Sequence, residues 1–280
     1  MKGLSRLRAQ IETLDLKIVR LLNQRLDLSA EVGRVKRRTH GSAFAPEREE
    51  YLLRFLEEKS AGPLLPAHLR SIYHEIFSSS RSRQAPLAIG YLGAPVSTSL
   101  MAARTRFGAA ETYRPHASWK ALLSALRSGK AHIGVVPASA LAQAAKAADT
   151  TSPLGKTLRI CGEIPLHREI GGETHYLIAP ASPTPKDCEA PEEEPGAKRL
   201  FRASLPAAAG RDAFSRWCRR HRLQPVETAP ASTGSARLIE TDRSGKTPAS
   251  APLEASLQSA FGPRARLHLL GAFAPPSYGR

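Results

Sequence analysis

The fold of this chain is decided by residues 4–38, which read LSRLRAQIETLDLKIVRLLNQRLDLSAEVGRVKRR. Apolar side chains recur there at steps of three and four, from Leu4 and Leu7 to Val32 and Val35. This period predicts one amphipathic helix, which would be about 50 Å long. Two short helices of the same chain cannot cover so long an apolar stripe, so we expect a partner chain to cover the rest.

Two shorter helices are expected to follow the long one. Pro46 can begin a helix as its first residue, and this second helix is expected to end near Lys59. A third helix is expected from about Pro66 to about Gln84. The sequence therefore predicts an all-α domain of three helices over residues 1–85.

The hydrophobic pattern changes after the helical region. Strand-like runs at 87–92 and 132–136 lie on either side of a helical pattern at 118–127. This alternation predicts a small α/β unit over residues 86–180. Its later part is expected to contain a short Ala/Lys helix and a loop before a strand at 174–178.

The last part of the chain predicts a third unit. Residues 181–197 are acidic and proline-rich, and we expect them to be a linker. Residues 198–280 are expected to form an α+β domain of order βαββαβ, which is typical of the split-βαβ or ferredoxin-like fold. Its strands are expected near 199–204, 224–229, 236–241 and 265–273, and its helices near 211–221 and 252–261.

The net charge of +16 suggests a partner that carries negative charge. Nucleic acid is one alternative, but the basic residues are spread along the chain without a zinc-finger or RNP-type motif, so no nucleic-acid partner is expected. A positive field could instead attract a dianionic substrate.

The three cysteines are far apart, and they predict neither a disulfide framework nor a metal site. No apolar run or N-terminal signal pattern indicates a membrane or secretion, so a cytoplasmic location is expected.

Five short motifs stand in order in the helical region. They are LRAQI at 7–11, LLNQR at 21–25, EVGRVK at 31–36, PERE at 46–49, and a serine and a glutamine at positions 80 and 84. The set resembles the landmarks of the all-helical chorismate mutases, at the spacing of the mutase domain in bifunctional chorismate mutase/prephenate dehydratases. The resemblance implies an isomerase that converts chorismate to prephenate in aromatic amino-acid biosynthesis, with no cofactor or metal.

The residue types suit this reaction. Chorismate has two carboxylates, a ring hydroxyl and an ether oxygen that gains negative charge as the C–O bond breaks. The rearrangement is unimolecular, so catalysis depends on holding a reactive conformer and on stabilising that charge. The resemblance implies that Arg8, Arg25, Arg48 and Ser80 bind the carboxylates, that Lys36 and Gln84 address the ether oxygen, and that Glu49 accepts from the hydroxyl.

Helix geometry supports part of this assignment. Arg25 and Lys36 are 11 residues apart, close to three turns, so they share one face of the first helix. Arg8 lies about 25 Å from Arg25 along the axis, so both cannot reach one small ligand from one helix. The resemblance implies an intertwined antiparallel homodimer in which the partner chain supplies Arg8. Each charged residue alone could be a solvated surface residue, and it is their joint spacing that favours a site.

Residues 86–180 resemble a prephenate dehydratase that is shortened and altered. The match rests on GYLG at 90–93, GVVP at 134–137 and THYLI at 174–178. The family's Glu-Asn-Ser motif is replaced by Ser-Ala-Leu at 139–141, and the arginine of its Thr-Arg-Phe motif by His175. Room for a whole second lobe is also missing, so we expect dehydratase activity to be lost.

The C-terminal unit resembles the regulatory ACT domain that follows the dehydratase, with LLGAF at 269–273 as its last strand. The phenylalanine-binding landmarks are poorly matched, so regulation through that pocket is not expected. Two alternatives to a monofunctional mutase stay open. One is a bifunctional mutase and dehydratase, and the other is a non-catalytic regulator or nucleic-acid-binding protein.

Overall fold

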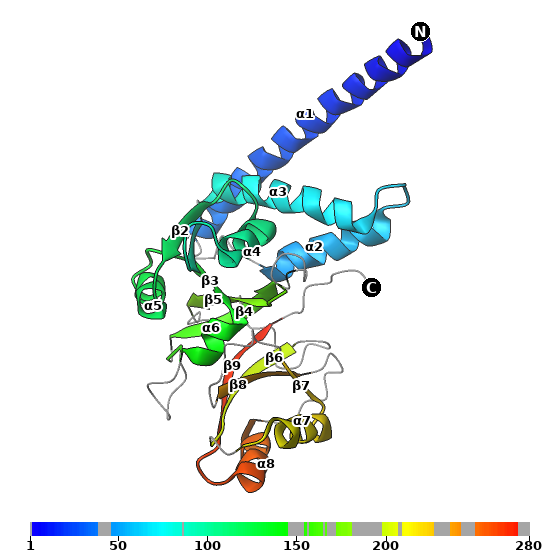
Figure 1. Cartoon of the computed structure of the whole chain (residues 1–280). Coiled ribbons are helices and arrows are strands. Elements are labelled where there is room, and N and C mark those ends of the chain that lie inside the picture. The colour runs from blue at the N-terminus through cyan, green and yellow to red at the C-terminus, as the bar shows by residue number, and fades with distance from the viewer. Residues whose placement is uncertain are drawn as a thin grey trace.

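The computed structural model describes residues 2–38, 46–85, 87–144, 154–155, 157–164, 166, 172–180, 198–206, 209–226, 236–241 and 250–273. In these ranges the chain forms eight helices and nine strands. A helical N-terminal region is followed by two β-sheets, and helix α1 projects away from the rest of the molecule (Figure 1).

The helical region confirms the three predicted helices. They are α1 (Lys2–Arg38), α2 (Pro46–Lys59) and α3 (Pro66–Gln84). Arg70 connects α2 to α3 with a two-pronged ion pair, in which Nε and Nη2 lie 2.6 and 2.8 Å from the two carboxylate oxygens of Glu57. Such a fork fixes the relative orientation of the two helices because both contacts must form together.

Helix α3 packs against the C-terminal half of α1 only (Figure 1). Gly33 is buried there, and a Cβ at this position would lie 2.9 Å from Cα of Gln84. The glycine therefore allows the two backbones to approach closely. Leu22 and Ser29 lie on the same face of α1 and are half-buried.

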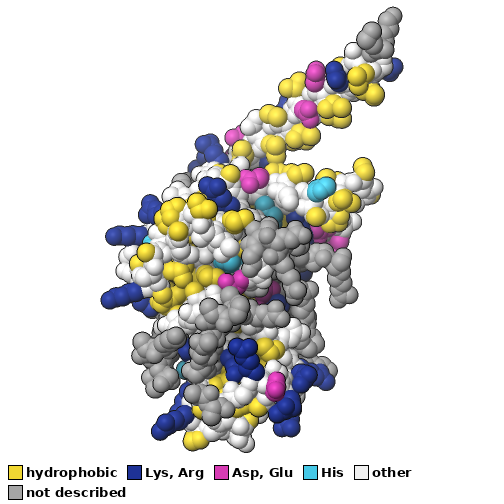
Figure 2. All heavy atoms as spheres, in the orientation of Figure 1, with side chains coloured by type: hydrophobic (Ala, Val, Ile, Leu, Met, Phe, Trp, Pro, Cys, Tyr) yellow, Lys and Arg dark blue, Asp and Glu magenta, His cyan; other side chains and the backbone are white. Residues whose placement is uncertain are grey.

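The N-terminal half of α1 carries the same apolar face without a cover. Ile11 and Ile18 lie about three turns and one turn before Leu22 on that face, and they are 56% and 53% exposed. Leu4, Leu7 and Leu14 are also more than half exposed. Figure 2 shows hydrophobic side chains along the projecting helix.

A five-stranded sheet follows the helical region. Its strands are β1 (Ala88–Leu92), β2 (Thr112–His116), β3 (Ile133–Pro137), β4 (Leu158–Ile164) and β5 (His175–Pro180), in the order β2-β1-β3-β5-β4. The strands β2, β1 and β3 are parallel, β5 pairs antiparallel with β3, and β4 pairs antiparallel with β5. One face packs against α4 (Thr98–Phe107), and the other packs against α5 (Trp119–Arg127) and α6 (Ala138–Gln143).

The predicted elements of this unit are partly confirmed. The strands β1, β3 and β5 and the helix α5 lie where they were expected, and Ser118 caps α5 by accepting from the amide of Ala121. The prediction of a loop between α6 and β5 is wrong, because 158–164 form the edge strand β4. This strand pairs on one side only and has an irregular register between Ile160 and Gly162. Neither α4 nor β2 was predicted.

The C-terminal unit confirms the predicted βαββαβ order. Its elements are β6 (Lys198–Ser204), α7 (Arg211–Arg220), β7 (Leu223–Pro225), β8 (Ala236–Thr241), α8 (Ser250–Phe261) and β9 (Arg266–Phe273). The sheet order β7-β8-β6-β9, with antiparallel neighbours throughout, is that of a split-βαβ fold. The expected linker 181–197 and the end of the strand expected at 224–229 lie outside the described residues.

The two sheets share one hydrophobic core. Leu200, Leu238 and Phe273 of the C-terminal sheet pack into the same cluster as Tyr176 of β5. A Cβ at Gly271 would lie 2.1 Å from the carbonyl oxygen of Ile160, so β9 approaches β4 closely only because of this glycine. The opposite face of the C-terminal sheet packs against α7 and α8. The C-terminal unit therefore rests on the α/β unit through its core.

Candidate active site

Helices α1 and α3 bring Arg25 and Ser80 together. Arg25 Nη1 donates a hydrogen bond to Ser80 Oγ, and Ser80 Oγ donates to the carbonyl of Ile76 at 2.7 Å. The guanidinium carbon of Arg25 also lies 5.6 Å from the ring centroid of Phe77. These contacts hold Arg25 beside α3, although Arg25 and Ser80 are 55 positions apart in sequence.

The close contact at Gly33 sets the position of Gln84 relative to Lys36. Lys36 follows Gly33 by three residues, so both project toward the same side of α1. Gln84 is the last residue of α3, and its backbone and side chain lie directly over Gly33. Lys36 and Gln84 are both half-buried. The expected pair of donors therefore lies at the C-terminal end of the interface between α1 and α3.

Glu49 reaches the same region from α2, and it has partners that the sequence did not predict. Its Oε1 forms an ion pair with Arg81 Nη1, and its Oε2 lies 3.0 Å from Arg106 Nη1. Burial lowers the pKa of Arg25 below its usual value, and the charges of Tyr73 and Glu49 oppose this lowering. The Glu49 carboxylate is thus held by two arginines.

Two of the predicted site residues lie outside this group. Arg48 is exposed on α2, and its guanidinium carbon lies 5.2 Å from the ring centroid of Tyr51. Arg8 is exposed on the projecting half of α1. One chain therefore brings Arg25 to Ser80, Gln84 to the turn of α1 before Lys36, and Glu49 to Arg81, the residue after Ser80, and it leaves Arg8 on the projecting half of α1.

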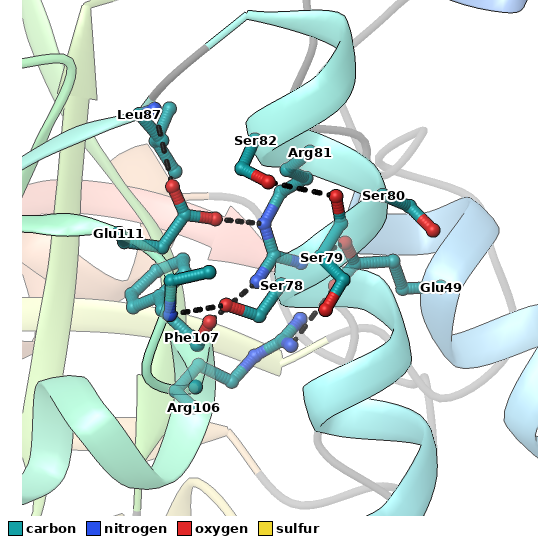
Figure 3. Close-up of polar contacts among 12 residues, drawn as sticks. Glu49, Ser78, Ser79, Ser80, Arg81, Ser82, Leu87, Arg106, Phe107 and Glu111 are labelled. Carbon is teal, nitrogen blue, oxygen red and sulfur yellow. Dashed lines mark hydrogen bonds and ion pairs between the residues drawn. The ribbon is translucent and has the colours of Figure 1, made fainter. Parts of the chain in front are cut away.

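Sequence reasoning missed a buried cluster behind Glu49. Arg81 has a side chain only 3% exposed, and its Nε lies 2.8 Å from Oε1 of the fully buried Glu111. Burial lowers the pKa of Arg81, but the charges of Glu49 and Glu111 outweigh this, so its pKa is raised and it stays protonated. Figure 3 shows Arg81 between these two carboxylates. The signal in the sequence was an arginine directly after Ser80, which is one of two arginines between Ser80 and Gln84.

His74 of α3 lies near the same charges. Burial lowers its pKa to about 4, and the positive charge of Arg106 adds to this effect, while Glu49 opposes it. His74 is therefore neutral at physiological pH, and the positive charges around Glu49 come from arginines.

The described ranges give no sign of a metal centre or membrane helix. Among their His, Cys, Asp and Glu side chains, no group of three or more is arranged to hold a metal ion. None of the helices that the structure describes is long and apolar enough to cross a membrane.

Comparison with known proteins agrees with the geometry of the helical region. Residues 7–85 match the chorismate mutase type II family. The expected resemblance of the helical region is therefore confirmed, and the match includes every predicted site residue. The same region contains the facing helices and the cluster of Arg25, Ser80 and Gln84.

Longer matches extend beyond residues 7–85, the mutase-type domain. The bifunctional chorismate mutase/prephenate dehydratase of Pseudomonas aeruginosa is 31% identical over 179 residues, which cover 61% of this chain and 49% of that protein. The protein of the same description from Aquifex aeolicus is 32% identical over 141 residues, which cover 49% of this chain and 39% of that protein. The matched part of the chain thus spans about half of these curated relatives or less.

Solved structures overlap with about two thirds of the chain. Prephenate dehydratase from Streptococcus mutans has a TM-score of 0.36 at 16% identity, over 68% of this chain and 98% of that one. GqqA, described as a novel type of quorum quenching acylase, has a TM-score of 0.40 at 17% identity, over 67% of this chain and 94% of that one. Both scores are below 0.5.

Proposed function

We propose that the protein is a chorismate mutase that converts chorismate to prephenate by an intramolecular rearrangement. The observation that carries this proposal is the cluster of Arg25, Ser80, Lys36 and Gln84 between α1 and α3, in a domain that matches the mutase family. Arg25 supplies a planar fork for a carboxylate, and Ser80 holds that fork in place. Arg48, which is exposed on α2, would assist a second carboxylate.

Lys36 and Gln84 have the chemistry to stabilise the transition state. The ether oxygen of chorismate becomes negative as its bond to carbon breaks, and an ammonium and an amide N–H can both donate to it. Donors that are already in place need no reorganisation during the reaction, which is the main source of catalysis in such sites. Glu49 would accept from the ring hydroxyl, since the two arginine contacts do not use all the acceptor sites of a carboxylate.

We also propose that two chains form an antiparallel dimer and that the partner supplies Arg8. The support is the uncovered apolar face of α1, which continues the face that α3 covers further along the helix. Exposed apolar residues on α2 and α3, Tyr51, Phe55 and Ile72, and Leu65 just before α3 add surface that a second copy could cover. A dimer of this kind would bring Arg8 to the otherwise incomplete site.

The α/β unit and the C-terminal unit are proposed to lack dehydratase activity. The arginine of the family's Thr-Arg-Phe motif is replaced by His175, which is fully buried in β5. Among the described residues between α6 and β5, the edge strand β4 is the one element that forms, and the 31 positions between Gln143 and His175 are too few for a whole second lobe. The C-terminal unit is proposed to be ACT-like because of its sheet order. A cytoplasmic location is proposed for the protein because the curated relatives are described as enzymes of chorismate and prephenate chemistry.

The test is an assay of the full chain with chorismate at neutral pH, with both prephenate and phenylpyruvate measured. The proposal expects chorismate to be consumed and prephenate to accumulate, and it expects Lys36→Ala to abolish most of this turnover. Neutral pH is needed because prephenate decays to phenylpyruvate in acid. Absence of turnover in the wild type would refute the mutase, and phenylpyruvate that scales with enzyme would favour the bifunctional alternative.

A further inference from the structure

The carboxylate of Glu49 is held between two different units of the fold. Arg81 belongs to α3 of the mutase-type domain, whereas Arg106 belongs to α4 of the α/β unit. Each arginine contacts a different oxygen of the carboxylate, and the Arg106 contact is 3.0 Å long. The side chains of Glu49 and Arg106 are each 12% exposed, so little water competes for this ion pair.

The α/β unit also fixes Arg81. Besides its contact with Glu111, Arg81 donates from Nη2 to the carbonyl of Phe107 at 2.7 Å. The second oxygen of Glu111 accepts from the backbone amide of Leu87 at 3.1 Å. Every nitrogen of the guanidinium is therefore used, and two of the three contacts are made to residues after the mutase-type domain (Figure 3).

The segment after α4 is docked on α3 by its backbone. Gly108 has φ of 77°, and a Cβ there would lie 2.6 Å from Cβ of Ser78. The amide of Ala110 donates to Ser78 Oγ at 3.0 Å, and the amide of Ala109 donates to Glu75 at 3.1 Å. This docking leaves α4, and hence Arg106, little freedom to move relative to α3.

We propose that the α/β unit is a positioning element of the mutase site and that Arg106 is the residue through which it acts. This inference rests on the proposed function, because Glu49 is the group proposed to accept from the ring hydroxyl of the substrate. Arg106 holds one carboxylate oxygen from a rigid support, and it does so without any need to contact the substrate itself. The unit that is proposed to lack dehydratase activity thus has a role in the mutase reaction.

The experiment compares Arg106→Gln with Arg104→Gln in the full chain. Arg104 is the matched control because it is an exposed arginine of the same helix, 5.9 Å from the ring centroid of Tyr113 and away from Glu49. Misplacement of one catalytic group lowers turnover by between about 10- and 100-fold, so kcat for chorismate is expected to fall by that factor in Arg106→Gln. Arg104→Gln is expected to keep the wild-type kcat, and Arg106→Lys is expected to recover part of the loss.

A double-variant cycle separates positioning from a general loss of structure. In the background of Glu49→Gln, the further change Arg106→Gln is expected to have no additional effect on kcat, because the group that it positions is already altered. The positioning role alone would be overturned if the two changes lowered kcat by independent factors that multiply. It would also be overturned if the wild type were active and Arg106→Gln had the same kcat as Arg104→Gln. An inactive wild type would instead refute the proposed function and this role with it. Arg106→Lys, which keeps the charge, provides the test if Arg106→Gln does not fold.

Discussion

The exposed apolar face of α1 predicts how strongly the dimer depends on single residues. The change Ile11→Ala removes three carbons from a side chain that is 56% exposed in the single chain. At about 0.8 kcal/mol per buried CH₂, burial of that exposed part contributes about 1.3 kcal/mol per chain. A symmetric dimer loses this twice, so the expected loss is about 2.7 kcal/mol, or roughly 100-fold in the dissociation constant.

Sedimentation equilibrium of the full chain over a range of concentrations measures this constant. The matched control is Leu16→Ala, because Leu16 is 73% exposed on the same helix but lies about 140° round the axis from Ile11. The control is expected to weaken the dimer far less than Ile11→Ala does. Equal dissociation constants for the two variants, or a wild type that stays monomeric at high concentration, would refute the reasoning that this face meets a second copy.

Three further predictions concern the site and its support. Lys36→Ala and Gln84→Ala are each expected to raise the free-energy barrier behind kcat by on the order of 3 kcal/mol, with a much smaller change in KM, because both donors act on charge that develops in the transition state. Steady-state kinetics at neutral pH measures both constants, and near-normal turnover in either variant would show that its residue does not have this role. Gly33→Val is expected to destabilise the protein by about 1–3 kcal/mol, because the new side chain meets the backbone of Gln84, and urea unfolding measures it against Gly3→Val, where a Cβ meets nothing within 4 Å. Burial raises the pKa of Glu163 to about 6, and the charge of Glu240 adds to this while Lys198 opposes it. The folded state therefore binds that proton more tightly than the unfolded state, so the free energy of unfolding falls as the pH rises from about 4.5 to 6. Glu163→Gln is expected to reduce this fall by roughly 2 kcal/mol at most in urea unfolding at pH 5 and pH 7.5, and an unchanged difference between the two pH values would contradict it.

The sequence predicted the helical region well because its elements have strong local signals. The helix α1 has an apolar residue at nearly every third or fourth position, and α2 and α3 both begin at a proline. The C-terminal βαββαβ order was also predicted. By contrast, α4 is short and reads TSLMAARTRF, which has no clear apolar period, and β2 reads TYRPH with a proline in an edge strand.

The candidate site was predictable only in part, for reasons that concern long-range contacts. The spacing of Arg25 and Lys36 on one helix is a local property, and the structure places Gln84 over Gly33, three residues before Lys36. The partners of Glu49 come from α3 and from the unpredicted α4, 32 and 57 positions away in sequence. No pattern along the chain specifies which arginine will reach a carboxylate at such a distance, because that depends on how the units pack.

The claim that one chorismate site is built from two chains is tested most directly by mixing two inactive variants. Arg8→Ala and Lys36→Ala are each expected to be nearly inactive, because every site in either homodimer lacks one required group. After subunit exchange at equal amounts, half of the dimers carry one of each chain, and one of their two sites is free of both changes. Activity is therefore expected to return to about a quarter of the wild-type value. Activity that stays at the level of the separate variants, after exchange has been verified with labelled chains, would contradict a site shared between two chains.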